Sequence, residues 1–326
     1  MAGPLIERYR DRLPVSSGTP VISLGEGSTP LLPVPRLAEQ LGVRELWVKW
    51  EASNPTGSYK DRGMTVAVSK AVEEGAEAVI CASTGNTAAS AAAYAARAGI
   101  RAVVLSPKGA VAGAKVAQTR MLGAAVLEVR GDFDEALDAA RELAARGTHH
   151  LVNSLNPYRR EGQKTAVFEV VEELGAPPDA FVIPYGGGGN TSAYAQARSE
   201  LGIDTPIVSA EAADRRRTVA SAIRIGEPAH AEAVAGAGAL VVTLTDEQIL
   251  AAWRLLAATE GLFCEPSSAA GIAAIREGAV EGERLVATVT GHGLKDVEVA
   301  ALHAPPPVEV DADPDAIARA SAARGR

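Results

Sequence analysis

One lysine stands out because of the residues around it. Lys60 follows an apolar run, Leu46–Trp50, that predicts a buried strand, and it precedes a helical pattern over Thr65–Glu74. The Asn-Pro and Thr-Gly pairs in between are typical of a turn, so we expect Lys60 at the start of the helix. The positive end of the helix dipole disfavours a cation there, and an uncharged amine can attack a carbonyl and form a Schiff base. A lone loop lysine is far more often a solvated surface residue, so its neighbours must decide.

The neighbours of Lys60 form a longer motif. Residues Asn54–Met64 read Asn-Pro-Thr-Gly-Ser-Tyr-Lys-Asp-Arg-Gly-Met. This stretch resembles the lysine motif of the threonine synthase family, whose members are pyridoxal-phosphate enzymes of fold type II. The resemblance implies that Lys60 is the catalytic lysine and carries pyridoxal 5'-phosphate as a Schiff base. Tyr59 stands where the family more often has phenylalanine, which keeps the aromatic ring.

Length and composition suit an enzyme with two lobes around a cleft. The chain has 326 residues, of which 47% are apolar, enough for large cores. The net charge of -8 argues against nucleic acid or an anionic membrane as the main partner. No apolar run approaches the roughly 20 residues of a membrane span, and the polar start shows no signal peptide. Cys81 and Cys264 lie far apart without metal-binding spacing, so we expect reduced core thiols in a cytoplasmic protein.

Short apolar runs alternate with helical patterns, which is typical of parallel sheets covered on both faces. Further strands are predicted at Ala78–Ser83, Ala102–Ser106, Ala125–Val129, His150–Ser154, Ala180–Tyr185, Pro206–Glu211 and Leu285–Thr290. Helices are predicted at Asn86–Ala98, Val111–Leu122, Phe133–Arg146, Gly162–Leu174, Thr191–Leu201, Asp246–Glu260 and Ser267–Glu277. We also expect a turn at Leu24–Leu31, a loop at Ala229–Leu240, and a linker with a terminal helix after His303. Because ligands bind beyond the carboxyl ends of parallel strands, the residues after each strand are the candidate site.

A polar turn follows the Ala78–Ser83 strand and leads into an alanine-rich helix. Its hydroxyls, its amide and the free N–H groups of the helix start are suited to a carboxylate or phosphate. Helix capping alone also explains these residue types. The family resemblance implies that Asn86 binds the ring hydroxyl of the cofactor. It also implies that Ser83, Thr84 and Thr87 bind the substrate carboxylate and neighbouring groups.

The run Asn153–Thr165 resembles the threonine synthase family in particular. Other fold type II enzymes share parts of the run but not usually all of it. The resemblance implies that Ser154 and Arg159 donate to the phosphate of phosphohomoserine. A guanidinium suits that role because it forms paired, charge-assisted hydrogen bonds with phosphate. The alternative is a loop and a first helical turn with solvated charges.

A glycine-rich loop follows the Ala180–Tyr185 strand and opens a helix. The loop consists of Gly186, Gly187, Gly188 and Gly189 and is followed by Asn190. Strand, glycine loop and helix together predict a phosphate cradle, because successive N–H groups can approach the anion. A dinucleotide site would place this loop early in the fold, so the phosphate of pyridoxal phosphate is the expected ligand. The loop departs from the Gly-Asn-Ala-Gly-Asn typical of threonine synthases and resembles that of serine/threonine dehydratases.

Later segments carry the resemblance further. Gly261–Ala270 is similar to another fold type II segment, and Thr290–Asp296 is similar to the C-terminal threonine synthase signature. The latter implies that the Thr290 hydroxyl meets the pyridine nitrogen of the cofactor. By contrast, Glu211–Asp214 departs from the family pattern. Arg215–Arg217 after it is most simply a solvated face, with a second role in binding phosphate as the weaker alternative.

The resemblance covers about residues 20 to 300 and implies an α/β fold type II pyridoxal-phosphate enzyme. Each of two lobes should hold a largely parallel sheet flanked by helices. We expect residues 1–50 to join the large lobe, 51–155 to form the small lobe, 156–305 to form the large cofactor-binding lobe, and 306–326 to form a tail. Because the family is often dimeric, a homodimer is expected.

The implied reaction converts O-phospho-L-homoserine and water to L-threonine and phosphate. Lys60 would move protons at Cα and Cβ, and pyridoxal phosphate would act as the electron sink. The nearest alternative is a related eliminase or β-replacement enzyme for another amino acid. The Gly186–Gly189 loop favours that alternative and the Asn153–Thr165 run disfavours it. A catalytically idle cofactor-binding protein and a nicotinamide enzyme are further alternatives, which the Schiff-base absorption band would distinguish.

Overall fold

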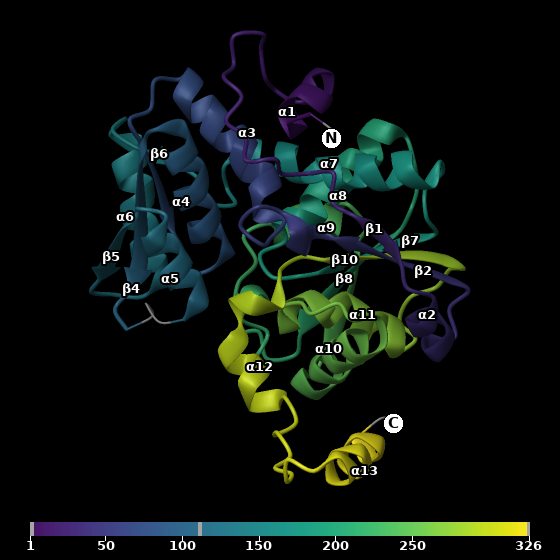
Figure 1. The fold of residues 1–326 in the computed structure, drawn as a ribbon. Helices are drawn as coiled ribbons and strands as arrows, with labels where there is room; N and C mark the ends of the chain where they lie inside the picture. Colours follow the sequence, from purple (N-terminus) through teal and green to yellow (C-terminus); the bar gives the residue numbers. More distant parts are fainter. Residues whose placement is uncertain (1–2, 110–112, 325–326) are drawn as a thin grey trace. The chain divides into compact units, whose positions relative to one another are not determined.

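The computed structural model describes residues 3–109 and 113–324, and the strands in these ranges form two sheets (Figure 1). Six strands follow the order β1-β2-β10-β7-β8-β9 and four follow the order β5-β4-β3-β6. Among the described strands, all neighbours run parallel except β1 and β2. The larger sheet holds β1 (Leu31–Pro33), β2 (Glu45–Trp50), β7 (Ala180–Pro184), β8 (Ile207–Ala212), β9 (Leu240–Leu244) and β10 (Arg284–Val289). The smaller sheet holds β3 (Ala78–Ala82), β4 (Arg101–Pro107), β5 (Ala125–Val129) and β6 (His150–Leu151).

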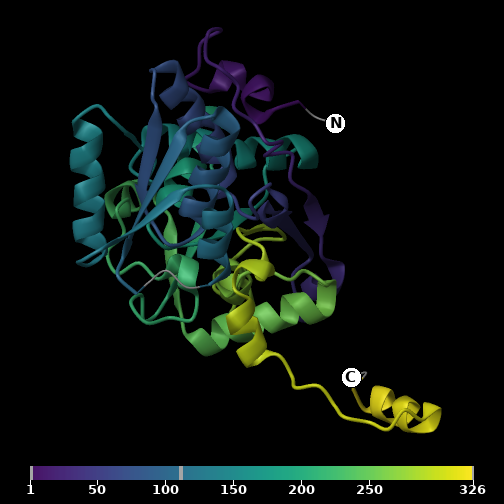
Figure 2. The ribbon, with the colours of Figure 1, turned by 60° about the vertical axis from the view of Figure 1, so that its left-hand side comes forward.

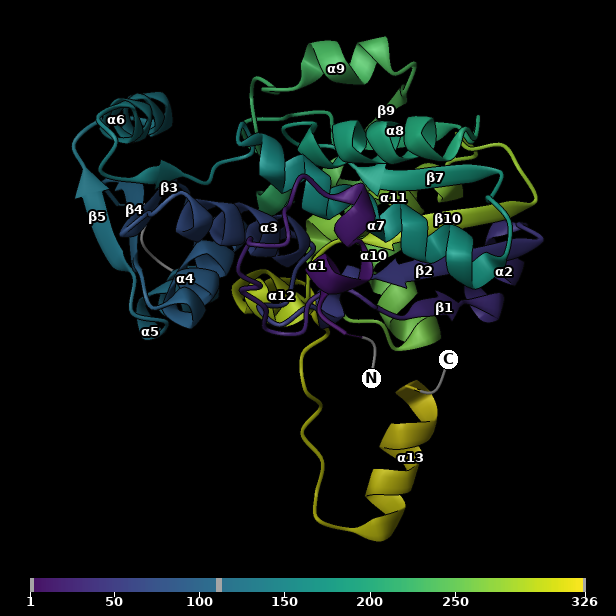
Figure 3. The ribbon, with the colours of Figure 1, turned by 90° about the horizontal axis from the view of Figure 1, so that it is seen from above.

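Helices cover both faces of each sheet. Near the larger sheet lie α1 (Leu5–Arg8), α2 (Pro35–Leu41), α7 (Pro157–Leu174), α8 (Gly189–Leu201), α9 (Ala231–Gly236), α10 (Asp246–Glu260) and α11 (Ala270–Arg276). Figure 1 shows α7 and α8 on one side of this sheet and α10 and α11 on the other. The smaller sheet is accompanied by α4 (Asn86–Ala98), α5 (Ala114–Met121) and α6 (Phe133–Ala145), and α3 (Lys60–Glu73) packs against both α4 and α7. Helix α6 lies on one side of the smaller sheet and α4 and α5 on the other (Figures 2 and 3).

Burial follows from this layering. The central strands β3 and β7 are buried along their whole length, as expected for parallel strands covered on both faces. The edge strand β5 carries several exposed residues. Both cysteines, Cys81 and Cys264, are free and buried, which confirms the prediction of core thiols. Burial raises the pKa of the Cys81 thiol to about 12, so this thiol is unreactive.

Most predicted elements are confirmed, with small shifts at their ends. Helix α4 spans Asn86–Ala98 as predicted, and α3 begins at Lys60 itself. Helix α7 starts earlier than predicted, because Asn156 caps it by accepting from the Tyr158 N–H at 2.9 Å and Pro157 suits its first position. The predicted start of one helix at Val111 lies outside the described residues, and α5 begins at Ala114.

Two predictions on local structure were wrong. Strand β6 has only two residues instead of the predicted His150–Ser154. Beyond β6, the Asn153 side chain takes the place of backbone hydrogen bonds to the neighbouring strand β3. Its Nδ2 donates to the Ala82 carbonyl, and its Oδ1 accepts from the Ala82 N–H. The predicted loop Ala229–Leu240 holds helix α9 and the first residue of β9. The predicted turn Leu24–Leu31 is confirmed except for its last residue, which begins the short edge strand β1.

By its internal contacts, the chain divides after Asp296. The second unit holds α12 (Val297–His303) and α13 (Pro314–Arg324), and α13 confirms the predicted terminal helix. The predicted assignment of residues 1–50, 51–155, 156–305 and 306–326 to lobes and tail stays a prediction. In residues 3–109 and 113–324, no helix combines the length and apolar character needed to cross a bilayer.

Candidate active site

The loop before Lys60 is tied to the end of β10. The Tyr59 N–H donates to the Thr290 carbonyl at 3.0 Å, and the His292 N–H donates to the Gly57 carbonyl at 2.9 Å. These bonds hold the start of α3 beside the carboxyl end of a central strand. Two residues predicted to share a site, Lys60 and Thr290, are therefore brought together by backbone hydrogen bonds.

The Lys60 amine has no anionic partner. Its Nζ lies over the Tyr59 ring, 4.5 Å from the ring centroid. Among the described residues, no side chain or backbone group forms a hydrogen bond or an ion pair with this amine. Nearby, the buried hydroxyl of Ser58 also has no partner. An amine at the positive end of a helix without a carboxylate beside it is suited to covalent chemistry.

The Thr290 hydroxyl belongs to a small buried cluster. It lies 2.8 Å from Ser268 Oγ, and the Gly291 N–H donates to the same Ser268 oxygen at 2.9 Å. The partner of the Thr290 hydroxyl is itself a hydroxyl, while the Glu265 carboxylate lies beside Gly291 and accepts from Asn86. A ring nitrogen that met Thr290 would therefore face a neutral partner.

Asn86, at the first position of α4, is fixed by a buried carboxylate. Its Nδ2 donates to Glu265 Oε2 at 2.7 Å, and its Oδ1 is buried without a partner. Glu265 in turn pairs with Lys115 of α5 at 2.7 Å, and Lys115 also pairs with Asp296 at 2.7 Å. Burial lowers the pKa of Lys115, but the two carboxylates outweigh burial and raise this pKa above its usual value. Through Glu265, the network therefore connects Asn86 of α4 to Lys115 of α5.

Two glycines of the loop have little room for a side chain. A Cβ added at Gly186 would lie 3.1 Å from Ile223 Cα, and one at Gly188 would lie 3.0 Å from Val234 Cγ2. Gly188 also has a φ of +84° at the N-cap of α8, a conformation that favours glycine. Behind the loop, Asn190 is 6% exposed, and its Nδ2 has no partner. The start of α8 thus offers unobstructed N–H groups and an unpaired amide, which together suit an anion.

Arg215 holds the glycine loop in place, so the predicted solvated face of Arg215–Arg217 was wrong for this residue. Its Nη2 donates to the Gly186 carbonyl at 2.5 Å, and its guanidinium lies over the Tyr185 ring, 4.8 Å from the centroid. It also pairs with Glu211. Arg216 and Arg217 are exposed, as predicted.

Ser154, from the loop before α7, lies next to the start of α8 in space. A Cβ added at Gly189 would lie 3.7 Å from Ser154 Cβ and 3.6 Å from the Cδ2 and Nε2 atoms of His230. The structure therefore brings Ser154 to the glycine loop and adds a histidine that the sequence did not single out.

Arg159 is buried with most of its donors unused. The residue is 1% exposed, and its Nη1 donates to the Val152 carbonyl at 2.7 Å. Its Nε and Nη2 are buried without a partner, and burial lowers its pKa below the usual value. The guanidinium packs against α3, since a Cβ added at Gly63 would lie 2.8 Å from Arg159 Nε. Asp61 is near enough to oppose this shift, but no carboxylate of the described residues forms the direct ion pair that normally accompanies a buried cation.

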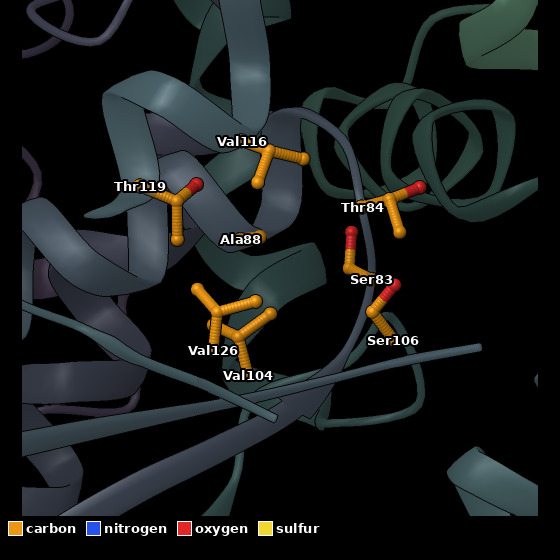
Figure 4. Close-up of a pocket in the computed structure, with 8 residues that line it drawn as sticks. All are labelled: Ser83, Thr84, Ala88, Val104, Ser106, Val116, Thr119 and Val126. Carbon is orange, nitrogen blue, oxygen red and sulfur yellow. The ribbon is translucent and has the colours of Figure 1, made fainter. Parts of the chain in front are cut away.

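Ser83, Thr84 and Thr87 lie at the start of α4 and are half-buried. The Gly85 N–H donates to Ser83 Oγ at 3.1 Å. Ser83 and Thr84 also border a pocket that is too narrow to hold a water molecule (Figure 4). Its other lining residues are Ala88, Val104, Ser106, Val116, Thr119 and Val126. Because Lys60, Asn86 and the glycine loop do not line it, this pocket is separate from the cluster around Lys60.

Comparison with known proteins identifies the family. The sequence pattern described as "Pyridoxal-phosphate dependent enzyme" matches residues 22–291. The chain belongs to the pyridoxal-phosphate-dependent enzymes. Within them it belongs with the threonine synthases, since several curated relatives of that name match most of its length. The threonine synthase of Halalkalibacterium halodurans is 46% identical over 91% of this chain and 90% of its own. The Mycobacterium tuberculosis (strain ATCC 25618 / H37Rv) threonine synthase is 46% identical over 96% and 94%, and that of Methanocaldococcus jannaschii is 42% identical over 96% and 86%.

Solved structures confirm the fold type II architecture of this pyridoxal-phosphate enzyme. Maize serine racemase matches with a TM-score of 0.76 and 21% identity, covering 91% of this chain and 97% of that chain. A threonine deaminase from T.th. matches with a TM-score of 0.74 and 27% identity, covering 89% and 97%. The predicted fold class is therefore confirmed, with two largely parallel sheets flanked by helices.

The residues of this site fit pyridoxal phosphate. An unpaired amine at Lys60 suits its aldehyde, and the cradle at the start of α8 suits its phosphate. The unpartnered Oδ1 of Asn86 and the Thr290 hydroxyl suit its polar ring atoms. These groups come from the ends of β2, β3, β7 and β10, where a ligand of parallel sheets is expected.

Sequence reasoning missed three residues of this site. Glu265 and Lys115 meet Asn86 only through tertiary packing, and neither stands in a motif that predicts a buried ion pair. His230 falls in the segment that we predicted as a loop. His230 lies far from the glycine loop in the sequence, so no local signal links the two, and only the packing of the segment around α9 brings them together.

Proposed function

We propose that this enzyme is a threonine synthase, which converts O-phospho-L-homoserine and water to L-threonine and phosphate. The observation that carries the proposal is Arg159, a buried guanidinium with two unpartnered nitrogens. A substrate phosphate would supply the missing anion and accept both donors. Ser154, on the same run of chain, provides a hydroxyl close to the glycine loop. The relatives named threonine synthase support the same reaction.

In this proposal, the cofactor is held by groups at strand ends. Lys60 would hold pyridoxal phosphate covalently through Nζ. Asn86 would bind the ring hydroxyl, and the Thr290 hydroxyl would bind the ring nitrogen as a neutral partner. The N–H groups of Gly186, Gly187, Gly188 and Gly189, together with Asn190, would hold the cofactor phosphate. Bound pyridoxal phosphate supplies an electron sink that stabilises negative charge at the substrate carbons.

The chain itself orients the substrate and moves protons. The hydroxyls of Ser83, Thr84 and Thr87 and the free N–H groups of α4 hold the substrate carboxylate. Lys60 Nζ accepts and returns protons at Cα and Cβ, a task suited to an amine without an ion-pair partner. Ser154 and Arg159 hold the phosphate and stabilise its charge as it leaves from Cγ.

Turnover of O-phospho-L-homoserine by protein loaded with pyridoxal phosphate tests this function, with both products identified. We expect phosphate and L-threonine in equal amounts, and loss of both in Lys60→Ala. Lys70→Ala is the matched control, because Lys70 lies on the same helix but pairs with Glu73 near the surface. Absence of turnover in protein that shows the absorption band of the cofactor–lysine bond would contradict the proposal.

A related eliminase is the second candidate. The run of four glycines favours it, since this loop is similar to that of dehydratases, and a threonine deaminase is among the similar structures. The same assay separates the two functions. Phosphate released with 2-oxobutanoate in place of threonine would mean elimination without hydration at Cβ.

We further infer that the enzyme works in the cytoplasm as a homodimer in amino-acid biosynthesis. Two free, buried cysteines support a reducing compartment. The dimer is expected from the family alone. Light scattering of the purified protein, which reports mass in solution, tests it directly.

A further inference from the structure

His230 lies against the glycine loop. Its backbone N–H donates to the Gly187 carbonyl at 3.1 Å, and its Cβ would lie 3.1 Å from a Cβ added at Gly188. Its ring lies at the first residue of α8, with Cδ2 and Nε2 each 3.6 Å from a Cβ added at Gly189. The Ser154 Cβ lies 3.7 Å from the same Cβ added at Gly189. The ring therefore borders both the loop proposed for the cofactor phosphate and the serine proposed for the substrate phosphate.

The imidazole leaves a polar atom unused there. His230 Nε2 is buried and has no hydrogen-bond partner, and the same is true of Asn190 Nδ2 in the first turn of α8. Asn190 is itself 6% exposed. A buried polar atom without a partner costs free energy, and two such atoms at one helix start point to a ligand that both can bind. The positive end of the helix makes that ligand an anion.

The surrounding charges also favour an anion. Burial, the guanidinium of Arg160 on α7 and the amine of Lys60 on α3 lower the pKa of His230, against an opposing interaction with the Ser154 backbone. Without a ligand, these surroundings therefore favour the neutral ring. A dianion bound at Nε2 would reverse this balance, because it stabilises the imidazolium and draws a proton from solvent.

We propose that His230 binds a phosphate group at the start of α8 and donates its Nε2–H to a phosphate oxygen. The same chemistry could serve the cofactor phosphate or the substrate phosphate. The substrate arm rests on the function proposed above, whereas the cofactor arm rests only on the family. In either case, His230 acts as a binding residue that titrates, unlike the hydroxyls and backbone groups around it.

The test compares His230→Gln with the wild-type holoenzyme by calorimetric titration of inorganic phosphate. Glutamine keeps a donor but cannot become a cation. We expect His230→Gln to weaken phosphate binding roughly tenfold or more at about pH 6 and less at about pH 8, because the wild-type ring loses its charge over that range. His149→Gln is the matched control, since His149 contacts Thr148 in the loop before β6. It should bind phosphate as the wild type does at both pH values.

A second titration separates the two phosphates. The affinities of pyridoxal phosphate and of pyridoxal, which lacks the phosphate, are measured with the apoenzyme of the wild type and of each variant. A loss confined to pyridoxal phosphate assigns His230 to the cofactor phosphate. A loss confined to inorganic phosphate in the holoenzyme assigns it to the substrate phosphate.

Unchanged affinity of His230→Gln for inorganic phosphate and pyridoxal phosphate would overturn the proposal. His230→Asn, with a shorter side chain, serves if His230→Gln does not fold. These titrations need no turnover, so their outcome is independent of the outcome with O-phospho-L-homoserine. Absence of turnover of O-phospho-L-homoserine would overturn the threonine synthase proposal. It would not decide whether His230 binds phosphate, which the titrations test separately.

Discussion

Two buried arginines of this molecule are in opposite states. Arg62 on α3 and Arg159 on α7 are 0% and 1% exposed. All three Arg62 nitrogens are paired: Nε with Glu51 at 2.7 Å, Nη1 with Glu169 at 2.8 Å, and Nη2 with Glu169 at 2.6 Å. Arg159 has one bond, to a backbone carbonyl, and two unpartnered nitrogens.

The electrostatics of the two arginines differ accordingly. Burial lowers the pKa of Arg62, but Glu169 and Glu51 outweigh burial and raise it well above the usual value. Burial dominates at Arg159, whose pKa is lowered. The comparison teaches that burial alone does not separate a structural charge from a functional one, whereas the count of satisfied donors does. Arg62 completes a buried ion-pair cluster with Glu51 and Glu169, whereas Arg159 keeps two donors without an acceptor.

The largest expected effect is the loss of the paired arginine. Arg62→Met leaves the buried carboxylates of Glu51 and Glu169 without their main partner, which costs about 3–5 kcal/mol. Urea denaturation measures the change in the free energy of unfolding. A loss below about 1 kcal/mol would erase the difference between the two arginines, since exposed ion pairs contribute that much.

Arg159→Met should instead spare the fold and damage the reaction. Removing a desolvated cation with few partners changes the unfolding free energy little, because a methionine of similar length fills the space. Loss of two charge-assisted bonds to phosphate should lower kcat/KM for O-phospho-L-homoserine by roughly a hundredfold or more. Steady-state kinetics and urea denaturation on the same sample check both halves. Destabilisation as large as that of Arg62→Met would make Arg159 a structural residue.

The sequence predicts a site residue when the pattern that indicates it lies within a few residues along the chain. Lys60 at the start of α3 and Asn86 at the start of α4 follow from local turn and helix patterns, and so does the glycine loop before α8. Such signals lie within a few residues of the position they predict. The sequence also suggested Arg159 by its family motif, but not that its donors would lack partners.

Features that depend on tertiary packing escaped prediction. His230 approaches Gly189 only because α9 packs on α8. The Glu265–Lys115 ion pair joins a residue beside the larger sheet to a residue of α5, beside the smaller sheet. Asn153 replaces part of a strand with its side chain, which apolar periodicity cannot reveal. Arg215 reads as one of three surface arginines until the Gly186 carbonyl lies beside it.

The Arg62 cluster should also fail with acid. Burial raises the pKa of Glu169, but Arg62 and Lys49 outweigh burial, so its pKa in the folded state lies below the ordinary value of 4.5. A lowered carboxyl pKa contributes stability above pH 4.5 that is lost as the pH falls toward the folded-state pKa. Glu169→Gln should therefore be about 2 kcal/mol less stable than wild type near neutral pH. That gap should narrow below pH 4.5, as urea denaturation across pH would show. A gap that is constant across pH would mean that the charge of Glu169 is not what stabilises the cluster.

Glu265→Gln should have the smallest effect on stability. Glutamine keeps an acceptor for Asn86, and Lys115 keeps its pair with Asp296. The expected loss is about 1 kcal/mol, measured by urea denaturation, because each partner of Glu265 keeps an acceptor. If Glu265→Gln cost as much as Arg62→Met, Asn86 would depend on the charge of Glu265 as the ion-pair cluster depends on Arg62.

The most direct test of the comparison is the effect of inorganic phosphate on the unfolding free energy of the holoenzyme. Phosphate that binds only the folded protein stabilises it increasingly with concentration. The account predicts this stabilisation in the wild type and its absence in Arg159→Met, with both proteins equally stable when phosphate is left out. Equal stabilisation of the two proteins by phosphate would contradict the claim that Arg159 is buried and unpaired in order to bind an anion.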